Sequence, residues 1–523
     1  MRHELTGRCG GALLFALAVL AACSRSSDEP TRPPNVLWVM WDTVRADHLS
    51  LYGYARPTTP FLSEWAKDAR VFDDALSVAG YTLPSHASMF TGLLPSEHCV
   101  STQHPWLDDS FTTVAELLRG AGYRTFLFSA NPHVAAAPGG NLAQGFERYE
   151  YPWSPKWAAE AKRVILAKLA PEDQSSELPQ RLNASRGGQA GSAWDIKAAG
   201  EIAQTATLEW LASSDRERPY FVFLNYMEAH RPATPPRRLR ERLLSPEDVE
   251  RSYRVDRSWL PMWEYTFGLR EYTEAELELT RATYDAALLE LDELLDNLLE
   301  ALDDAGYLDN TVVIVSSDHG EHLGEAHMLD HQYSLHQVLL HVPLVVYAPK
   351  RFPAGRETRP VATFDLFPTV LELAGVPLPA GLRSHAVSLL APQTQRRLLA
   401  ESPETSLVGI AQVKRAHPDF DPAPFQRSLR TLVADARKFV WGSDGRNALY
   451  DLSTDPLETR NLLSDEPQLA ARLEGELGDL SGTLVRCDAA SLADGLGGLS
   501  PEQRRRLEVL GYLEERVDAQ PKH

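Results

Sequence analysis

The segment Asn35-Val36-Leu37-Trp38-Val39-Met40-Trp41 is a continuous apolar run that ends at Asp42 and Thr43. A run of this length without polar alternation is typical of a strand buried on both faces of a sheet. Strands of this kind that alternate with helical patterns predict an α/β fold, in which a large mixed, mostly parallel sheet is flanked by helices. Four further apolar runs follow: Thr125-Phe126-Leu127-Phe128, Tyr220-Phe221-Val222-Phe223-Leu224, Thr311-Val312-Val313-Ile314-Val315 and Pro343-Leu344-Val345-Val346-Tyr347.

The clearest helical pattern runs from about Glu274 to Ala305. Thr273 and Glu276 have the spacing of a capping box, and Gly306 is placed to end the helix. The apolar stripe of this helix is expected to pack on the sheet while its acidic face meets water. The stripe consists of Leu288, Leu291, Leu295, Leu298 and Leu302.

The N-terminal residues predict export and a lipid anchor. An apolar run from Gly10 to Ala22 is too short to span a bilayer, so residues 1–22 are interpreted as a signal peptide. The tetrad Leu20-Ala21-Ala22-Cys23 resembles the lipobox of bacterial lipoproteins, which implies lipidation of Cys23 and a location in the cell envelope, at the outer membrane. An ordinary secreted protein with an incidental Cys23 is the alternative. The polar, Pro-rich residues 23–34 are expected to be a linker.

The pattern after the linker indicates two domains. Residues 35–392 hold the α/β pattern, and residues 393–523 hold short strands with polar turns, which predicts a smaller C-terminal α+β domain with an antiparallel sheet and a tail helix near Ser500. Residues 151–195 and 237–272 interrupt the α/β alternation and are interpreted as insertions.

Composition excludes some classes of function. The chain has 523 residues and a formal net charge of −20, so we expect no nucleic-acid binding, which depends on Lys and Arg neutralising phosphates. Four cysteines exclude a disulfide-built scaffold. Cys99 and Cys487 are either free thiols or one disulfide.

Polar side chains follow three of the predicted strands. Asp42 follows the first, His230 comes soon after the strand at Tyr220, and Asp318 and His319 end the strand at Thr311. Ligands of parallel sheets collect at the carboxyl ends of the strands, and buried charges there must be paired or bound to metal. These residues therefore predict a divalent cation site.

The segment from Gly80 to Gly92 predicts a short helix whose N-terminus lies at Thr82. The N-terminus of a helix favours bound anions, so Thr82 would stand at an oxyanion site. A threonine in this place is more often a helix cap than a nucleophile.

Five motifs then appear in one order along the chain. They are Asn35 through Asp47, Thr82-Leu83-Pro84-Ser85-His86, His230-Arg231-Pro232, Ser317-Asp318-His319-Gly320-Glu321, and Leu449-Tyr450-Asp451-Leu452 with Asp455-Pro456-Leu457-Glu458 and Asn461. Together they resemble the sulfatase family of the alkaline-phosphatase superfamily. The resemblance implies that residues 35–392 are a catalytic domain.

The sequence also departs from the family's motifs at several positions. Thr82 stands where the family has the Cys or Ser that becomes formylglycine, so no formylglycine is expected. His86 replaces the signature Arg, Thr43 replaces a metal Asp, and His331 falls where relatives tend to have a Lys. A threonine ester cannot release sulfate by elimination at carbon, so water must attack sulfur or phosphorus in the second step.

The resulting prediction is a metal-dependent, sulfatase-like hydrolase of sulfuric or phosphoric esters, with one divalent ion, Ca, Mn or Zn, and an extracytoplasmic glycan or small organic ester as substrate. The alternatives are a phosphodiesterase or phosphonate monoester hydrolase, a phospho-head-group transferase, and a non-catalytic glycan-binding lipoprotein. The expected metal ligands are Asp42, Thr82, Asp318 and His319; the expected catalytic residues are Thr82, His230 and His331; and the expected substrate-binding residues are His86, His327 and Arg45.

Overall fold

The computed structural model describes residues 32–135, 140–168, 195–213, 215–349, 351–381, 385–392, 396–488 and 492. The described residues from Pro34 onward form one compact unit. The predicted signal peptide, Cys23, most of the linker and the tail helix near Ser500 lie outside the described residues. Within the described part of the chain, no helix is both long and apolar enough to cross a membrane.

The centre of the fold is an eight-stranded sheet with the order β11-β2-β10-β7-β1-β6-β4-β5. The strands from β7 to β5 pair in parallel, and β10 is antiparallel to both of its neighbours. The mixed, mostly parallel sheet of the sequence prediction is therefore confirmed. The strands are β1 Asn35–Trp41, β2 Arg70–Phe72, β4 Arg124–Ser129, β5 Arg148–Glu150, β6 Tyr220–Tyr226, β7 Thr311–Ser317, β10 Leu344–Tyr347 and β11 Gly355–Glu357.

The register of the three central strands positions the site. Trp41 of β1 is paired with Tyr226 of β6 on one side and with Ser317 of β7 on the other. Asp42 and Asp318 each follow these paired residues directly, so the two carboxylates emerge side by side at the carboxyl edge of the sheet. All residues of β6 and β7 are buried, as expected for continuous apolar strands covered on both faces.

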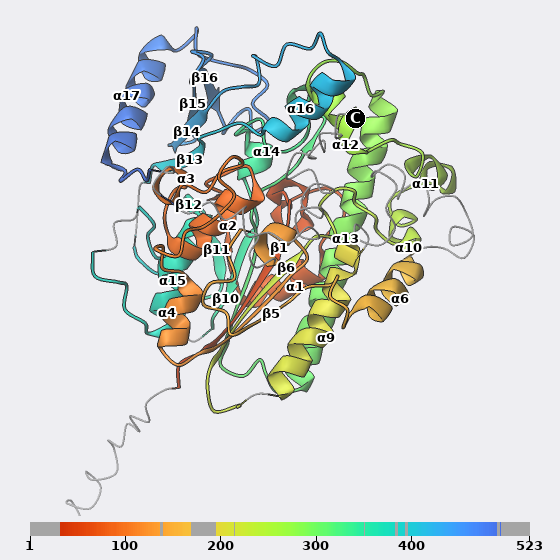
Figure 1. The fold of residues 1–523 in the computed structure, drawn as a ribbon, viewed down its shortest axis with the longest axis vertical. Helices are drawn as coiled ribbons and strands as arrows, with labels where there is room; N and C mark the ends of the chain where they lie inside the picture. The colour runs from red at the N-terminus through yellow and green to blue at the C-terminus, as the bar shows by residue number, and fades with distance from the viewer. Residues whose placement is uncertain are drawn as a thin grey trace, which may run out of the picture. The chain divides into compact units, whose positions relative to one another are not determined.

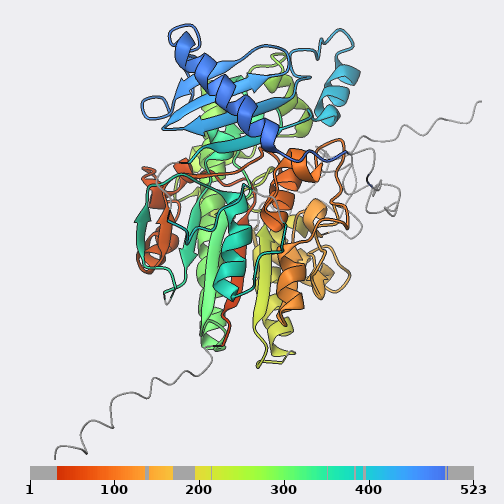
Figure 2. The ribbon, with the colours of Figure 1, turned by 90° about the vertical axis from the view of Figure 1, so that its left-hand side faces the viewer.

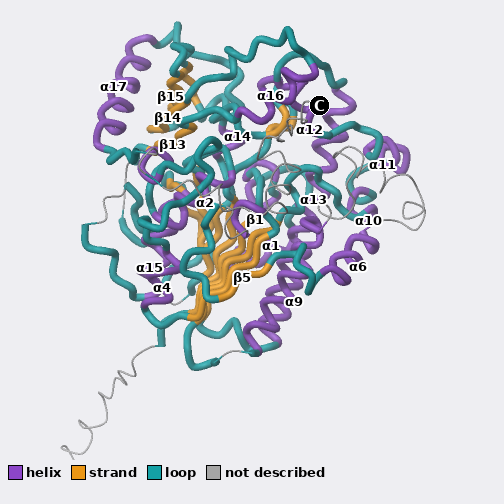
Figure 3. The backbone as a smooth tube through the Cα atoms, viewed as in Figure 1, coloured by secondary structure: helices purple, strands orange, loops and turns teal. Residues whose placement is uncertain are grey.

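Helices cover both faces of the sheet, as Figures 1 and 3 show, with α4 and α15 on one side and α9 and α13 on the other. The predicted capping box of α13 is present, since Thr273 accepts a hydrogen bond from the N–H of Glu276, and the leucine stripe is buried in the main core. The described α-helices are α1 Pro60–Trp65, α2 Thr82–Thr91, α3 Pro95–His98, α4 Val114–Gly120, α5 Pro132–Ala135, α6 Ala158–Lys168, α9 Ala199–Ala212, α10 Arg237–Arg240, α11 Pro246–Ser252, α12 Trp259–Thr266, α13 Glu274–Asp304, α14 Gln337–Leu340, α15 Leu366–Ala374, α16 Leu407–Ala416 and α17 Pro467–Thr483.

A smaller antiparallel sheet with the order β13-β14-β15-β16 forms the C-terminal part of the described chain. Helix α17 lies across this sheet (Figure 2), and its leucines share a core with β14 and β15. The smaller C-terminal domain of the prediction is thus present. The remaining strands are β13 Leu398–Ser402, β14 Leu429–Ala434, β15 Arg437–Gly442 and β16 Ala448–Asp451, with two short pairs, β3 Ala75–Leu76 with β12 Val361–Ala362 and β8 His322–Leu323 with β9 Leu329–Asp330.

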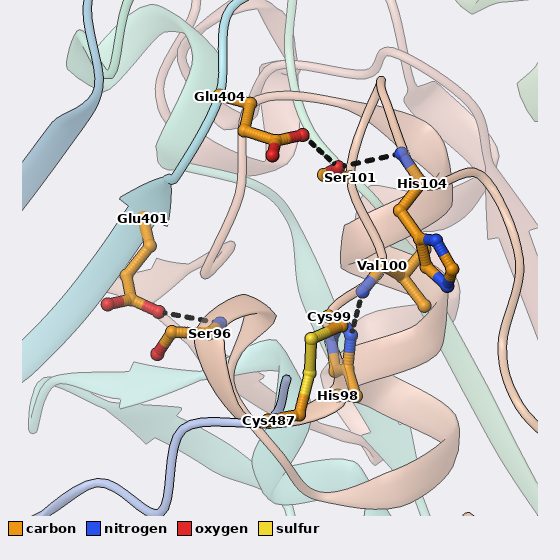
Figure 4. Close-up of a disulfide and its surroundings, with 9 residues drawn as sticks. All are labelled: Ser96, His98, Cys99, Val100, Ser101, His104, Glu401, Glu404 and Cys487. Atoms are coloured by element: carbon orange, nitrogen blue, oxygen red, sulfur yellow. Dashed lines mark hydrogen bonds between the residues drawn. A yellow bond between two sulfur atoms is a disulfide. The ribbon is translucent and has the colours of Figure 1, made fainter. Parts of the chain in front are cut away.

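A disulfide joins Cys99 to Cys487, whose Cα atoms lie 5.8 Å apart (Figure 4). The bond ties the segment after α3 to the end of the C-terminal domain. Next to it, the N–H of Cys487 donates to the carbonyl of Ser96. Of the two possibilities that the sequence left open for these cysteines, the structure contains the bridge.

Candidate active site

Asp42, Asp318 and His319 form a buried cluster whose ligand atoms all lie within 4.8 Å of one another. One oxygen of each carboxylate is held by the protein: Asn131 donates to Oδ2 of Asp42 at 2.9 Å, and the N–H of Thr43 donates to Oδ1 of Asp318 at 3.2 Å. The other oxygens, Oδ1 of Asp42 and Oδ2 of Asp318, are buried without a hydrogen-bond partner. Two buried oxygens are therefore left to bind a further group.

The electrostatics of this cluster favour a cation. Burial and the neighbouring Asp318 carboxylate raise the pKa of Asp42 to about 7, and burial also raises the pKa of Asp318. His319 donates from Nδ1 to the carbonyl of Gly320 at 2.9 Å, so its Nε2 carries the lone pair. Burial lowers the pKa of His319 to about 3, which keeps the ring neutral. Oxygen and imidazole donors of this kind fit a divalent ion.

Thr82 lies beside the cluster at the first residue of α2. Its Oγ1 is 3.2 Å from Nε2 of His319, and its side chain is fully buried. The other hydroxyls of the helix are engaged elsewhere: Ser85 donates to the carbonyl of Asp318 at 2.7 Å, and Ser88 lies 2.9 Å from Nε2 of His98. Thr82 is thus the hydroxyl of α2 that faces the ligand atoms.

A second buried cluster, Glu321, Asp330 and His331, adjoins the first. Nδ1 of His331 lies 3.0 Å from Asp330 and 3.3 Å from Glu321. Burial by itself lowers the pKa of His331, but the two carboxylates outweigh it and raise the pKa to about 10. Asp330 is also paired with Arg231 and accepts from Nε1 of Trp263 at 2.9 Å. His331 is therefore a cation, and its ring centroid lies 4.5 Å from that of His319.

His230 faces His331, with 5.4 Å between the ring centroids. Its Nδ1 lies 2.8 Å from the carbonyl of Arg231 and donates to it, so Nε2 is the acceptor. Burial and the positive charge of His331 lower the pKa of His230 well below its usual value. The site thus holds one neutral and one cationic histidine side by side.

The structure engages Arg45 and His327, two of the expected substrate-binding residues, in contacts within the protein. The Arg45 guanidinium is buried and paired with Asp47 and Glu325, both at 2.7 Å, so it holds the loop after β7 in place. The His327 side chain is 46% exposed and stacks on Tyr265, with centroids 4.1 Å apart.

His86 lies at the site but in a different place from the one expected. Its Nδ1 donates to the backbone carbonyl of Thr82 at 2.9 Å, and its ring packs between Phe90 and Phe223. Burial lowers the pKa of His86, so the ring is neutral. This arrangement fixes the first turn of α2, and the neutral ring supplies no charge to a bound anion.

Three residues of the site were missed by sequence reasoning. Asn131 follows the end of β4 by two residues, and the strand-end rule applied to that strand would have found it. Arg231 and Asp330 carry no such signal, because they meet only through the fold. The backbone of Asp330 has a φ of 77°, a region that a non-glycine residue adopts at a cost and that is common at functional sites.

A mostly parallel α/β sheet with carboxylates, imidazoles and a hydroxyl at its carboxyl edge defines an enzyme of the alkaline-phosphatase-like superfamily, a class of ester hydrolases. Residues 34–376 match the sequence profile of the sulfatase family. The chain belongs to that family.

Individual relatives agree with this assignment. The chain is 24% identical to arylsulfatase K of Xenopus laevis over 88% of this chain and 84% of that protein. It is 23% identical to N-acetylglucosamine-6-O-sulfatase of Bacteroides thetaiotaomicron over 72% and 74% of the two chains. Among solved structures, phosphonate monoester hydrolase of Agrobacterium radiobacter is similar with a TM-score of 0.65 and 21% identity, over 86% of this chain and 95% of that one.

Proposed function

We propose that this protein hydrolyses a sulfuric or phosphoric ester with Thr82 as nucleophile and one divalent cation at Asp42, Asp318 and His319. The observation that carries the proposal is the position of the Thr82 hydroxyl at the N-terminus of α2, where its Oγ1 lies 3.2 Å from Nε2 of His319. The N-terminus of α2 stabilises negative charge on the nonbridging oxygens of the ester, and Nε2 of the neutral His319 accepts a hydrogen bond from the Thr82 hydroxyl.

The donor set fits a metal ion because two buried carboxylate oxygens without hydrogen-bond partners and one imidazole nitrogen converge there. When bound, such an ion supplies positive charge that lowers the pKa of a neighbouring hydroxyl and draws charge from the ester oxygens. Asn131 and the N–H of Thr43 fix the orientation of the two carboxylates.

In the first step, Oγ1 of Thr82 forms a bond to sulfur or phosphorus as the bond to the leaving oxygen breaks. The neutral His230 is suited to accept the hydroxyl proton on Nε2. The cationic His331 binds the anion and gives a proton to the leaving oxygen. Glu321 and Asp330 keep His331 charged until that transfer.

In the second step, water attacks sulfur or phosphorus and releases Thr82. A threonine ester has no aldehyde hydrate through which sulfate could leave, so the enzyme must cleave the bond at the central atom. That chemistry is as accessible for phosphorus as for sulfur. We therefore propose that appreciable phosphate or phosphonate monoesterase activity accompanies any sulfatase activity.

The similarity to a phosphonate monoester hydrolase supports this second substrate class. A phospho-head-group transferase is less favoured, since the relatives named above are sulfatases and a phosphonate monoester hydrolase. A purely glycan-binding role leaves the convergence of Thr82, His319 and His331 unexplained.

We further propose that the protein acts outside the cytoplasm on a lipid anchor at Cys23. The disulfide between Cys99 and Cys487 supports an oxidising compartment. Cys23→Ala should release the protein into the soluble fraction or leave the signal peptide uncleaved. Mass spectrometry that finds an unmodified Cys23 in the native protein would refute the anchor.

The hydrolase proposal is tested by the kinetics of matched aryl sulfate, aryl phosphate and aryl phosphonate esters. Thr82→Ala should lower kcat by at least about 10³-fold on every ester that the wild type cleaves. The control is Ser85→Ala, on the same helix but bonded to a backbone carbonyl, and it should cost far less. Undiminished hydrolysis by Thr82→Ala would overturn the assignment.

A further inference from the structure

A hollow with about 30 Å³ of space for water-sized molecules lies beside the residues that flank His230 and pair with His331. Its wall includes Ala229 and Arg231, which flank His230, and Glu321, which faces His331. The insertion between β6 and α13 contributes Arg257 and Met262. A space of this size has room for a small polar group such as a carboxylate.

Each charged side chain on this wall is paired with an opposite charge, except Arg257. Arg231 is paired with Asp330, and Glu321 with the cationic His331. Arg257 forms no ion pair or hydrogen bond with any residue that the structure describes. The pocket therefore carries a net positive charge inside a protein whose net charge is −20.

The surroundings of Arg257 explain why this charge is costly. Burial, together with the neighbouring Arg240 guanidinium, lowers the pKa of Arg257 to about 9, and the side chain remains a cation at neutral pH. Arg240 does not provide a counter-charge, because it donates to the hydroxyls of Ser252 and Thr283 at 2.8 and 3.1 Å. A partly buried guanidinium without a carboxylate is stabilised most by a bound oxyanion, which it can grip with two parallel hydrogen bonds.

We infer that this pocket binds a second anionic group of the substrate, a carboxylate or a further sulfate on the leaving group, through Arg257. The inference rests on the proposed function in one respect: the ester itself lies at Thr82, next to His230. The enzyme then prefers leaving groups that are themselves acidic, and the insertion at residues 237–272 sets that preference. Arg257 is a specificity residue and does not touch the reacting atoms.

The test compares esters that differ by one charge: the sulfate and phosphate esters of 3- and 4-hydroxybenzoate against those of the corresponding methyl hydroxybenzoates. The wild type should show a kcat/KM about tenfold or more higher for the carboxylates, the factor typical of one charge-assisted hydrogen bond. Arg257→Gln should abolish that ratio while the methyl esters are cleaved at the wild-type rate. Arg257→Lys should retain part of it. Arg254→Gln, an exposed arginine of the same insertion, should leave the ratio unchanged.

A binding measurement separates this inference from the proposed function. The melting temperature of the wild type should rise with D-glucuronate more than with D-glucose, and Arg257→Gln should remove the difference. Esters that are cleaved without preference for the carboxylate, or an unchanged ratio in Arg257→Gln, would overturn the inference and leave the hydrolase assignment intact. Protein that cleaves no ester but still binds D-glucuronate through Arg257 would overturn the hydrolase assignment and leave the anion pocket intact.

Discussion

Two buried clusters of the site contain the same kinds of side chain, two carboxylates and one imidazole, yet the pKa of the imidazole shifts in opposite directions in the two. In the first, the pKa of Asp42 is raised to about 7 and that of His319 is lowered to about 3. In the second, the pKa of His331 is raised to about 10, while Arg231 and His331 overcome burial and lower the pKa of Asp330 to about 2.

The difference lies in where the positive charge comes from. Asp330 is paired with Arg231, and the proton on His331 supplies a further positive charge to the second cluster. Among the described residues, the basic side chains nearest the Asp318 carboxylate are His86 and His319, and burial lowers the pKa of both, so neither supplies a comparable cation. Charge balance, more than residue type, distinguishes a metal site from an ion-pair network.

The largest effect should come from breaking the first cluster. Asp318→Asn removes the charge of an oxygen ligand and should lower kcat/KM by at least about 10³-fold, because charge on the ester and on Thr82 is no longer stabilised. The measurement is the initial rate on the preferred aryl ester, with circular dichroism to confirm the fold. A loss of less than tenfold would mean that Asp318 is not a ligand.

A smaller effect is expected from the second cluster. Asp330→Asn keeps the shape of the side chain but removes one of the two carboxylates that raise the pKa of His331. The histidine then loses its proton at a lower pH, so the alkaline limb of the kcat profile should move down from near pH 10 by one unit or more. With a shift of one to two units we expect a loss of about 5–50-fold at pH 10 and of at most about twofold at pH 8. An alkaline limb that stays in place would show that His331 does not act as the cation.

Removal of the metal should reveal that the buried Asp42 carboxylate destabilises the fold at alkaline pH. Asp42 has a raised pKa, so in the metal-free protein it binds a proton more tightly when folded than when unfolded, and its contribution to stability falls as pH rises from about 4 through 7. Asp42→Asn should therefore raise the Tm of the chelator-treated protein at pH 8 and change it little at pH 4. A Tm that is unaffected at pH 8, or a larger gain at pH 4, would contradict this sign.

The smallest effect is expected from a substitution at His327, outside the two clusters. His327 belongs to the same His-rich stretch as His331 but stacks on Tyr265 at the surface. His327→Ala should change kcat/KM by less than about twofold, in line with an exposed substitution. A tenfold loss would return His327 to the substrate-binding residues.

The sequence predicted the site best where a site residue directly follows a predicted strand. The apolar runs predicted β1, β6 and β7, and the rule that ligands gather at strand ends brought Asp42, Asp318 and His319 together before their geometry was known. The capping box of α13 and its glycine stop were likewise local signals that the structure reproduces.

Residues that act through distant contacts were beyond this reasoning. Proximity to a motif made Arg45 and His327 candidates, but their partners, Glu325 and Tyr265, decide where they point. Arg231 lies 99 positions from Asp330 in the chain, and no spacing rule joins them. The positive charge that distinguishes the second cluster from the first comes from Arg231, which reaches Asp330 only in the folded chain. The sequence alone could not show it.

Metal content by mass spectrometry of the purified protein tests the central claim most directly. The wild type should contain one divalent ion per chain, Asp318→Asn should have lost it, and Asp330→Asn should retain it, since the second cluster is balanced by Arg231 and the proton of His331. Two ions per chain in the wild type, or an ion that survives in Asp318→Asn and disappears in Asp330→Asn, would contradict the account.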